Sequence, residues 1–274
     1  MTKGESTAKA SLTTSRSARD AMTRPFRFQR FTVRQDRSAM KVGFDGVLLG
    51  AWANVTDCRR IVDVGSGTGL ISLMIAQRTE HNRSVTIDAV EIDEAAYDES
   101  MLNVRESPWK HRITCHHARI QDFARKNATQ FDLIVSNPPF FESTSHLPSN
   151  DNATPRTIAR QSAALSLGEL FENAARMLNP NGRLSLILPI DRKAASMNMA
   201  TANELSCCRC TTVKPNPAAV PKRVLLEFQA NGGRAISDLE NSTITIEQER
   251  RHIYSDEFTA LTRDYYLKSC LGSI

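Results

Sequence analysis

The sequence predicts an α/β fold: a Rossmann-like, doubly wound sheet that is mostly parallel and has an antiparallel terminal strand. Three observations predict it. Short apolar segments typical of buried strands alternate with helix-like segments along most of the chain, and this alternation is typical of parallel sheets. A glycine-rich turn at residues 65–69 directly follows the first of these strands. A rigid Asn-Pro-Pro-Phe turn follows the fourth, at residues 137–140, where open α/β sheets bind their ligands.

Composition indicates an ordinary globular protein. The chain has 274 residues, 41% hydrophobic and 24% charged, without an apolar run long enough to cross a bilayer and without a signal-peptide core. We therefore expect a cytoplasmic protein with no membrane contact, and nothing indicates an obligate protein partner. The net charge of +5 favours a polyanionic partner.

The chain ends are expected to differ from the rest. Residues 1–24 are rich in Ser, Thr, Ala, Lys and Arg, and we expect a disordered tail. The alternative, an organelle transit peptide, is less favoured because we find no clear amphipathic stripe. The sequence has no internal repeat and no linker, so we expect a single domain over residues 25–270.

Predicted elements of the first half alternate regularly. Residues 26–33 predict a short hairpin or an extended arm, and residues 47–52 begin a helix that is apolar on most sides. Buried strands are expected at 60–64, 85–91, 112–117 and 131–135, and helices at 70–78, at 94–105 and around Phe123.

The second half begins with a polar stretch, residues 142–160, which predicts a long functional or disordered loop. A helix over 167–178 is expected to stop at the sequence Asn-Pro-Asn-Gly. Further strands are expected at 184–188, 208–213, 223–228 and 243–246, and helices at 192–204 and 255–267. Only a Pro-rich loop separates the strands at 208–213 and 223–228, so that pair is expected to be antiparallel.

The cysteines do not indicate a metal site. Cys207 and Cys210 form one C-x-x-C pattern, but no second pair or nearby histidine completes a set of four zinc ligands. We interpret them as structural thiols and expect no bound metal.

The glycine turn indicates which kind of nucleotide binds. Gly65, Gly67 and Gly69 allow a tight turn and close approach of a ligand to the backbone. Leu70 stands where a dinucleotide-binding fingerprint has glycine, and no P-loop lysine follows. Asp63, just before the turn, would repel a pyrophosphate, so a cationic or zwitterionic ligand fits better.

Glu91 indicates where the ribose of this nucleotide would bind. It ends the next strand, about 20 residues further on, where a carboxylate accepts hydrogen bonds from ribose hydroxyls. The alternative is an exposed acid at a strand end. Together the turn and the acid favour S-adenosylmethionine over NAD as the cofactor.

The turn after the fourth strand is suited to hold a planar amine. Pro138 and Pro139 have no backbone N–H and fix two φ angles, which leaves the Asn137 side chain, rigid carbonyls and the Phe140 ring at one place. A lone Asn-Pro turn could equally be a strand cap; its position after a fourth strand favours the functional interpretation.

These residues resemble a known family. Residues 63–69 (DVGSGTG) are similar to the first motif of class I S-adenosylmethionine-dependent methyltransferases, and Asn137-Pro138-Pro139-Phe140 to the motif of those that methylate a planar amino nitrogen. Further segments narrow the resemblance to the bacterial tRNA adenine-N6 methyltransferases, which modify the adenine next to the anticodon of a valine tRNA. These segments are residues 40–52, 107–109, 221–226 and 254–262.

The resemblance implies roles for individual residues. The three glycines pass under the cofactor, Asp63 lies near its amino-acid end, Glu91 holds the ribose and Ile92 packs on the cofactor's adenine. Lys41 lies over the methionine part or faces the RNA backbone. The residues expected to hold the target base are Asn137, Pro138, Pro139 and Phe140, with Asn137 also next to the cofactor.

Two positions depart from the family pattern. The family usually has an acid at the cofactor-binding position 119, which accepts from the amine of the cofactor's adenine, but this chain has Arg119. Asp122 lies nearly one helical turn further on. Phe44 stands where a threonine is common. Neither departure touches the transfer chemistry.

The expected reaction is methyl transfer to the exocyclic amine of adenine in tRNA. If Asn137 and the Pro138 carbonyl each accept one N–H, the nitrogen lone pair can point at the methyl group while Phe140 stacks on the flipped base. Alternatives are another planar amine, in ribosomal RNA, DNA or protein glutamine, or a catalytically silent RNA-binding protein of the same fold. Candidate phosphate contacts are Arg156, Arg160, Lys222 and Arg223, for each of which solvated surface charge is the alternative.

Overall fold

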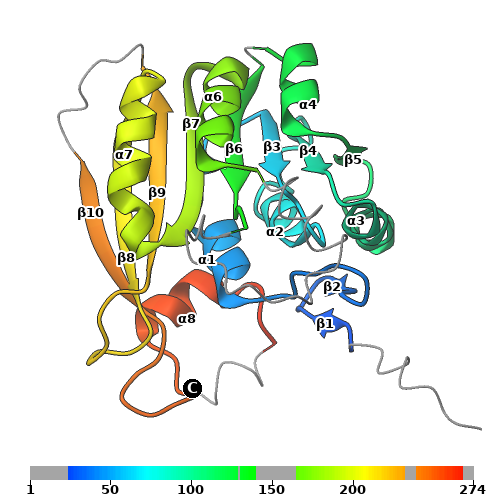
Figure 1. Cartoon of the computed structure of the whole chain (residues 1–274). Coiled ribbons are helices and arrows are strands. Elements are labelled where there is room, and N and C mark those ends of the chain that lie inside the picture. The colour runs from blue at the N-terminus through cyan, green and yellow to red at the C-terminus, as the bar shows by residue number, and fades with distance from the viewer. Residues whose placement is uncertain (1–23, 129, 140–164, 232–238, 268–274) are drawn as a thin grey trace, which may run out of the picture.

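The computed structural model describes residues 24–128, 130–139, 165–231 and 239–267. Its centre is an eight-stranded sheet in the order β10-β8-β9-β7-β6-β3-β4-β5 (Figure 1). The strands are β3 (Arg60–Val64), β4 (Thr86–Glu91), β5 (Ile113–His117), β6 (Phe131–Ser136), β7 (Leu178–Pro189), β8 (Leu205–Lys214), β9 (Arg223–Ala230) and β10 (Glu240–Thr245). Every neighbouring pair is parallel except the two that β9 makes, with β7 and β8. The predicted fold class and the antiparallel pair are confirmed.

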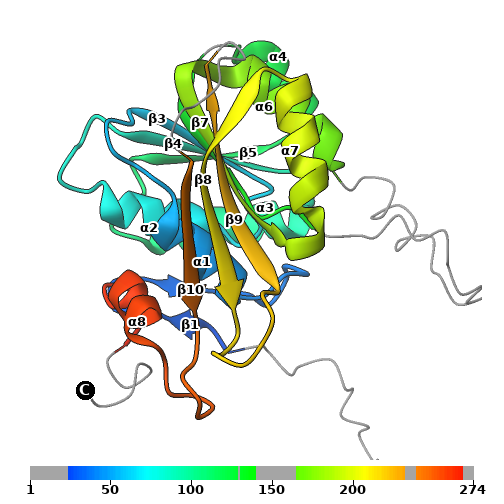
Figure 2. The ribbon, with the colours of Figure 1, turned by 90° about the vertical axis from the view of Figure 1, so that its left-hand side faces the viewer.

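Helices cover both faces of the sheet (Figure 2). Successive residues of a parallel strand point to opposite faces, so Leu133 and Val135 of β6 pack in one core cluster and Ile134 packs in the other. The first cluster includes residues of α1 (Phe44–Trp52), α2 (Leu70–Arg78) and α8 (Asp256–Thr262), and the second includes residues of α4 (Ile120–Lys126), α6 (Leu167–Met177) and α7 (Lys193–Ala202). Helix α3 (Glu94–Glu106) follows β4.

The two ends of the described chain are joined to each other. Residues 26–33 form a hairpin of β1 (Phe26–Arg27) and β2 (Thr32–Val33), the first of the two expected possibilities. Gln29 of its turn donates from its side chain to the carbonyls of Arg263 and Tyr266, both at 2.6 Å. The Phe28 and Tyr266 rings lie 5.8 Å apart. The hairpin and the segment after α8 therefore pack together at the same end of the molecule (Figure 1).

Several element bounds differ from the prediction, and strands β8 and β10 each begin three residues before the expected start. Helix α1 begins at Phe44, three residues before the expected start at 47, and α8 ends at Thr262 rather than at 267. Strand β7 begins at Leu178, but Phe131 of β6 pairs with Leu178 and Leu133 pairs with Arg183. Residues 179–182 are thus a bulge in β7. The bulge contains the Asn-Pro-Asn-Gly sequence at which α6 was predicted to stop, and because Leu178 before it already pairs with β6, the strand starts at 178 instead of 184.

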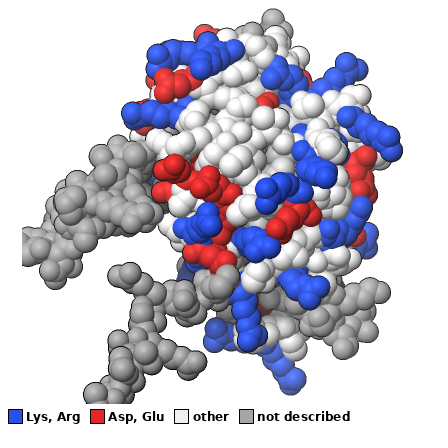
Figure 3. Space-filling view, turned by 90° about the vertical axis from the view of Figure 1, so that its right-hand side faces the viewer, with Lys and Arg blue, Asp and Glu red and all other residues white. Residues whose placement is uncertain are grey.

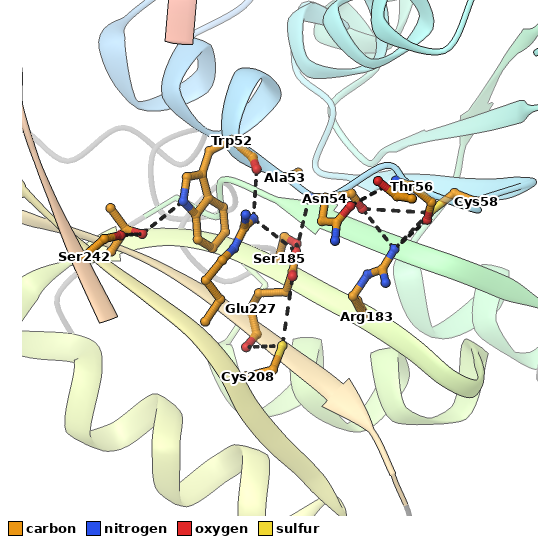
Figure 4. Close-up of polar contacts among 12 residues, drawn as sticks. Trp52, Ala53, Asn54, Thr56, Cys58, Arg183, Ser185, Cys208, Glu227 and Ser242 are labelled. Carbon is orange, nitrogen blue, oxygen red and sulfur yellow. Dashed lines mark hydrogen bonds and ion pairs between the residues drawn. The ribbon is translucent and has the colours of Figure 1, made fainter. Parts of the chain in front are cut away.

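A buried polar cluster ties the end of α1 to the sheet (Figure 4). Glu227 of β9 is 3% exposed, and its Oε2 accepts from Ser185 Oγ at 2.8 Å and from the Asn54 backbone N–H at 3.3 Å. Arg209 of β8 lies 3.4 Å from the same oxygen, and its guanidinium carbon is 3.6 Å from the centre of the Trp52 ring. One carboxylate thus connects three strands with the end of a helix.

We expect Glu227→Ala to lower the free energy of unfolding by about 3–5 kcal/mol, because it leaves the mostly buried Arg209 without its counter-charge. Glu227→Gln keeps acceptors for Ser185 and Asn54 and should cost less. A matched control is Glu172→Ala, whose carboxylate pairs with Arg176 on the surface at 2.7 Å and should change stability by less than about 0.5 kcal/mol. Chemical denaturation measures all three; equal losses for Glu227→Ala and Glu172→Ala would contradict this account.

Candidate functional site

The carboxyl ends of β3, β4 and β6 meet at one edge of the sheet, and the glycine turn lies there. Gly65, Gly67 and Gly69 have φ angles of +70°, +55° and +78°, a region that other residues adopt only with strain. The N–H groups of Gly65 and Ser66 both donate to the Val90 carbonyl, at 2.8 and 3.2 Å. The turn is therefore fastened to β4, and a methyl group added at Gly65 would have no neighbour within 4 Å, which leaves room for a ligand beside it.

Asp63, at the end of β3, is fully buried. Its Oδ2 accepts from the backbone N–H and the hydroxyl of Ser72, at 3.0 and 2.7 Å. Its Oδ1 has no hydrogen-bond partner among the described residues. Burial raises the pKa of Asp63 to about 7, and the neighbouring Glu91 carboxylate adds to the rise, against the effect of the Ser72 hydrogen bonds. A cationic ligand group nearby would favour the ionised form.

Glu91 organises the turn before any ligand is considered. Its Oε2 accepts from the Gly67 N–H, and its Oε1 accepts from the N–H groups of Ile92 and Asp93, all at 2.8 Å. The residue is 8% exposed. Because a carboxylate offers about four acceptor positions, it retains capacity for a hydroxyl group of a ligand.

The segment after the N-terminal hairpin packs on the glycine turn through two α3 side chains that sequence reasoning missed. Asn103 donates to the carbonyls of Arg34, at 3.0 Å, and of Thr68 in the glycine turn, at 2.9 Å. Glu99, 2% exposed, accepts from the backbone N–H groups of Arg37 and Ser38. One signal in the sequence could have indicated these contacts. Glu99 and Asn103 are four residues apart, so they lie on one face of α3, and two polar side chains on a face expected to be apolar indicate a buried polar contact.

Lys41 belongs to this segment. Its ammonium donates to the backbone carbonyls of Gln35 and of Ser38, the latter at 3.0 Å. The contacts that the structure gives it are thus within its own loop, which they hold in shape beside the glycine turn.

The turn at the end of β6 lies next to the glycine turn. Ser136 Oγ donates to the Val64 carbonyl at 2.7 Å and so joins the ends of β6 and β3. The Oδ1 atom of Asn137 is buried and has no hydrogen-bond partner among the described residues; its Nδ2 lies 3.9 Å from the Met40 sulfur. Pro138 is buried and Pro139 half-buried. Phe140, Arg156 and Arg160 lie outside the described residues.

A pocket opens beside the glycine turn. Its apolar lining includes Val64, Val90, Ile92 and Ile120, and its polar lining Arg119, Gln121 and Glu169. Ile92 is 41% exposed, and Arg119 is the exposed N-cap residue of α4. The predicted cofactor residues Gly65, Ile92 and Arg119 thus line one pocket, and Glu91 lies in the sequence between the lining residues Val90 and Ile92.

The described residues contain no group of three or more His, Cys, Asp or Glu side chains placed to hold a metal ion. Burial raises the pKa of Cys207 to about 12 and that of Cys208 to about 11, so both stay protonated thiols at neutral pH. Among the described helices, none has the length and apolar character needed to span a membrane.

Charge is mixed on the face that carries α3, α4 and the edge strand β5. Figure 3 shows Lys and Arg interspersed with Asp and Glu among the described side chains there. Such a surface is not the continuous basic stripe that typically follows a nucleic-acid backbone.

Comparison with known proteins agrees with this site. The model of the "Methyltransferase small domain" family matches residues 46–208. In structure, the chain is similar to a predicted O-methyltransferase from Agrobacterium tumefaciens, with a TM-score of 0.62 and 18% identity over 81% of this chain and 96% of that one. That likeness supports the fold.

Closer relatives were found by sequence. A protein named tRNA1(Val) (adenine(37)-N6)-methyltransferase from Phocaeicola vulgatus is 44% identical and covers 88% of this chain and 97% of its own. Proteins of the same name from Parabacteroides distasonis and Salmonella arizonae are 41% and 43% identical, over 89% and 88% of this chain and 98% and 94% of theirs. With this identity along almost the whole length, the chain belongs to the family of tRNA1(Val) (adenine(37)-N6)-methyltransferases.

Proposed function

We propose that this protein transfers the methyl group of S-adenosylmethionine to the exocyclic N6 amine of an adenine in valine tRNA, next to the anticodon. The observation that carries the proposal is the buried Oδ1 of Asn137, which has no partner among the described residues and lies at the end of a central strand beside the glycine turn. The named function of the relatives supports the choice of tRNA. A tRNA substrate favours a cytoplasmic enzyme.

The residues present fit the cofactor. The pocket has apolar walls suited to a planar base, and the backbone at Gly65 is open to a ligand. Glu91 follows the lining residue Val90 in the sequence and accepts from the Gly67 N–H of the same turn. The Oδ1 of Asp63, which no described residue hydrogen-bonds, is suited to the ammonium of the amino-acid part, directly or through water. S-adenosylmethionine supplies an activated methyl group on a sulfonium centre, so the chain itself need only position the acceptor.

The acceptor amine is a weak nucleophile because its lone pair is delocalised into the adenine ring. We propose that Asn137 Oδ1 and the Pro138 carbonyl each accept one N–H of this amine, which turns the lone pair toward the methyl group. Both acceptors are neutral, and the product loses its extra proton to solvent. Pro139 keeps the turn rigid. The resemblance to the family assigns stacking on the base to Phe140, which lies outside the described residues.

We also propose that one domain spans residues 25–270. The hydrogen bonds of Gln29 to Arg263 and Tyr266 support this, because they join its first and last described segments.

We expect Asn137→Ala to lower the rate of methyl transfer to tRNA by about 10²–10³-fold, the usual loss for one preorganised hydrogen bond in a transition state. Affinity for S-adenosylhomocysteine, measured by calorimetry, should stay within about threefold because the cofactor pocket is intact. Asn82→Ala, at an exposed asparagine between α2 and β4, is the control. An Asn137→Ala enzyme with full turnover would refute the mechanism, and a wild-type protein that methylates no tRNA would refute the proposed function.

The raised pKa of Asp63 predicts pH-dependent binding. Below pH 7 the carboxyl is largely protonated, and binding a ligand ammonium then requires loss of that proton, so affinity falls as pH is lowered. We expect the affinity for S-adenosylhomocysteine to rise between pH 6 and pH 8, by at most about tenfold per pH unit. Asp63→Asn, which cannot titrate, should bind more weakly and show a flatter profile in calorimetry. Parallel profiles for the two proteins would remove Asp63 from this role.

Lys222 is the best placed of the expected phosphate contacts among the described residues. It is exposed, and its backbone is held by hydrogen bonds with Val213 and Ile190 at the same edge of the sheet as the site. Arg223 instead donates to Asp45 at 2.8 Å.

We expect Lys222→Glu to weaken tRNA binding and to lower the slope of log affinity against log salt by about one, without changing cofactor affinity. Lys126→Glu, an equal charge change at the far end of α4, is the control. Equal tRNA affinities for these two variants would argue against the contact.

A further inference from the structure

The polar end of the pocket beside the glycine turn presents a chemical problem. An adenine ring bound in this pocket would direct an N–H donor of its exocyclic amine at the lining, and this donor needs an acceptor. Arg119, at the position where an acid would accept that hydrogen bond, carries only donors. The acceptor must come from another residue of the lining, and Gln121 and Glu169 are the other polar side chains there.

Glu169 is already engaged. Its Oε2 accepts from the backbone N–H of Ser166 at 3.1 Å and from the Ser166 hydroxyl at 2.8 Å, in the capping box that begins α6. Its Oε1 accepts from Gln121 Nε2 at 2.8 Å. The hydrogen bonds from Ser166 lower the pKa of Glu169, and the charge of Arg119 contributes in the same direction. Glu169 therefore stays ionised and fixed.

An ionised carboxylate accepts hydrogen bonds and donates none, which determines how the Gln121 amide is turned. Its nitrogen must face Glu169, so its oxygen points to the other side. In the described part of the chain no donor is bonded to that oxygen. Gln121 is half-buried in the first turn of α4 and lines the same pocket as Gly65 and Ile92.

We propose that Gln121 Oε1 accepts the hydrogen bond from the exocyclic amine of the cofactor's adenine, and that Glu169 is the positioning residue that orients the amide. This inference rests on the proposed function, because it assigns the base of the cofactor to this pocket. It also explains Arg119: the acid of the pocket comes from α6 instead of α4, and a cation at position 119 neutralises it where a second acid would repel it.

The test compares two ligands by calorimetry: S-adenosylhomocysteine and S-inosylhomocysteine, whose ring has a carbonyl oxygen in place of the amine. Wild-type protein should bind the adenine compound more tightly, because the inosine oxygen would face Gln121 Oε1 and two acceptors repel. Gln121→Leu should lose about tenfold in affinity for the adenine compound, and its preference between the two ligands should largely disappear.

Two further variants separate orientation from acceptance. Glu169→Gln keeps the capping box, which glutamine also supports, but lets the Gln121 amide turn either way, so the preference should fall while α6 stays folded. Asp122→Ala removes the acid of α4, whose carboxylate lies on the surface 2.7 Å from Arg125, and should leave the preference unchanged. Thermal unfolding checks that each variant is folded.

Distinct results separate this inference from the proposed function. Wild-type protein that binds neither ligand would overturn both. Wild-type protein that prefers adenine, together with a Gln121→Leu variant that keeps the same preference, would overturn only the role of Gln121. Loss of the preference in Asp122→Ala instead would assign the acceptor to Asp122 and contradict the proposal.

Discussion

The site depends on one carboxylate, that of Glu91, which receives the backbone N–H groups of Gly67, Ile92 and Asp93. These hydrogen bonds join the turn after β3 to the turn after β4, so the two turns hold a single arrangement. Charge-assisted hydrogen bonds of this kind are stronger than neutral ones, and burial of Glu91 shields these three from water. The glycine turn is thus shaped by the residue proposed to hold the ribose, which makes the cofactor site largely preformed.

The same arrangement explains the state of Asp63. Its carboxyl is buried near a second acid, and one oxygen lacks a partner among the described residues. A buried acceptor without a partner costs about 1–3 kcal/mol, and Asn137 Oδ1, which also has none among the described residues, adds a second such cost at the neighbouring turn. Both atoms face ligand donors in the proposed complex. The folded chain carries this cost in advance, and binding of cofactor and target base recovers it.

The sequence sufficed for features set by local patterns and not for those set by distant partners. The bounds of β3 and α2 agree with prediction, because a buried strand, a glycine turn and helical spacing are all local signals. The contacts of Asn103 with Arg34 and Thr68 join residues 69 and 35 positions apart, and the Gln121–Glu169 pair spans 48. No local pattern encodes such pairs. Arg119 therefore stands out as a departure in the sequence, while its compensating acid is evident only in the fold.

The two adenines of the proposed complex would be recognised by the same kind of group, a side-chain amide at the end of a parallel strand or in the helix after it. A carboxamide oxygen accepts from an exocyclic amine without holding a proton in the physiological range, so neither interaction changes charge with pH. At Gln121 the amide is oriented by Glu169, which suits a base that is only held. At Asn137 the amide nitrogen has only the Met40 sulfur, 3.9 Å away, as a partner among the described residues, so this amide is less fixed and suits an amine whose geometry must change during the reaction. The difference between holding and activating an amine thus lies in what surrounds each amide.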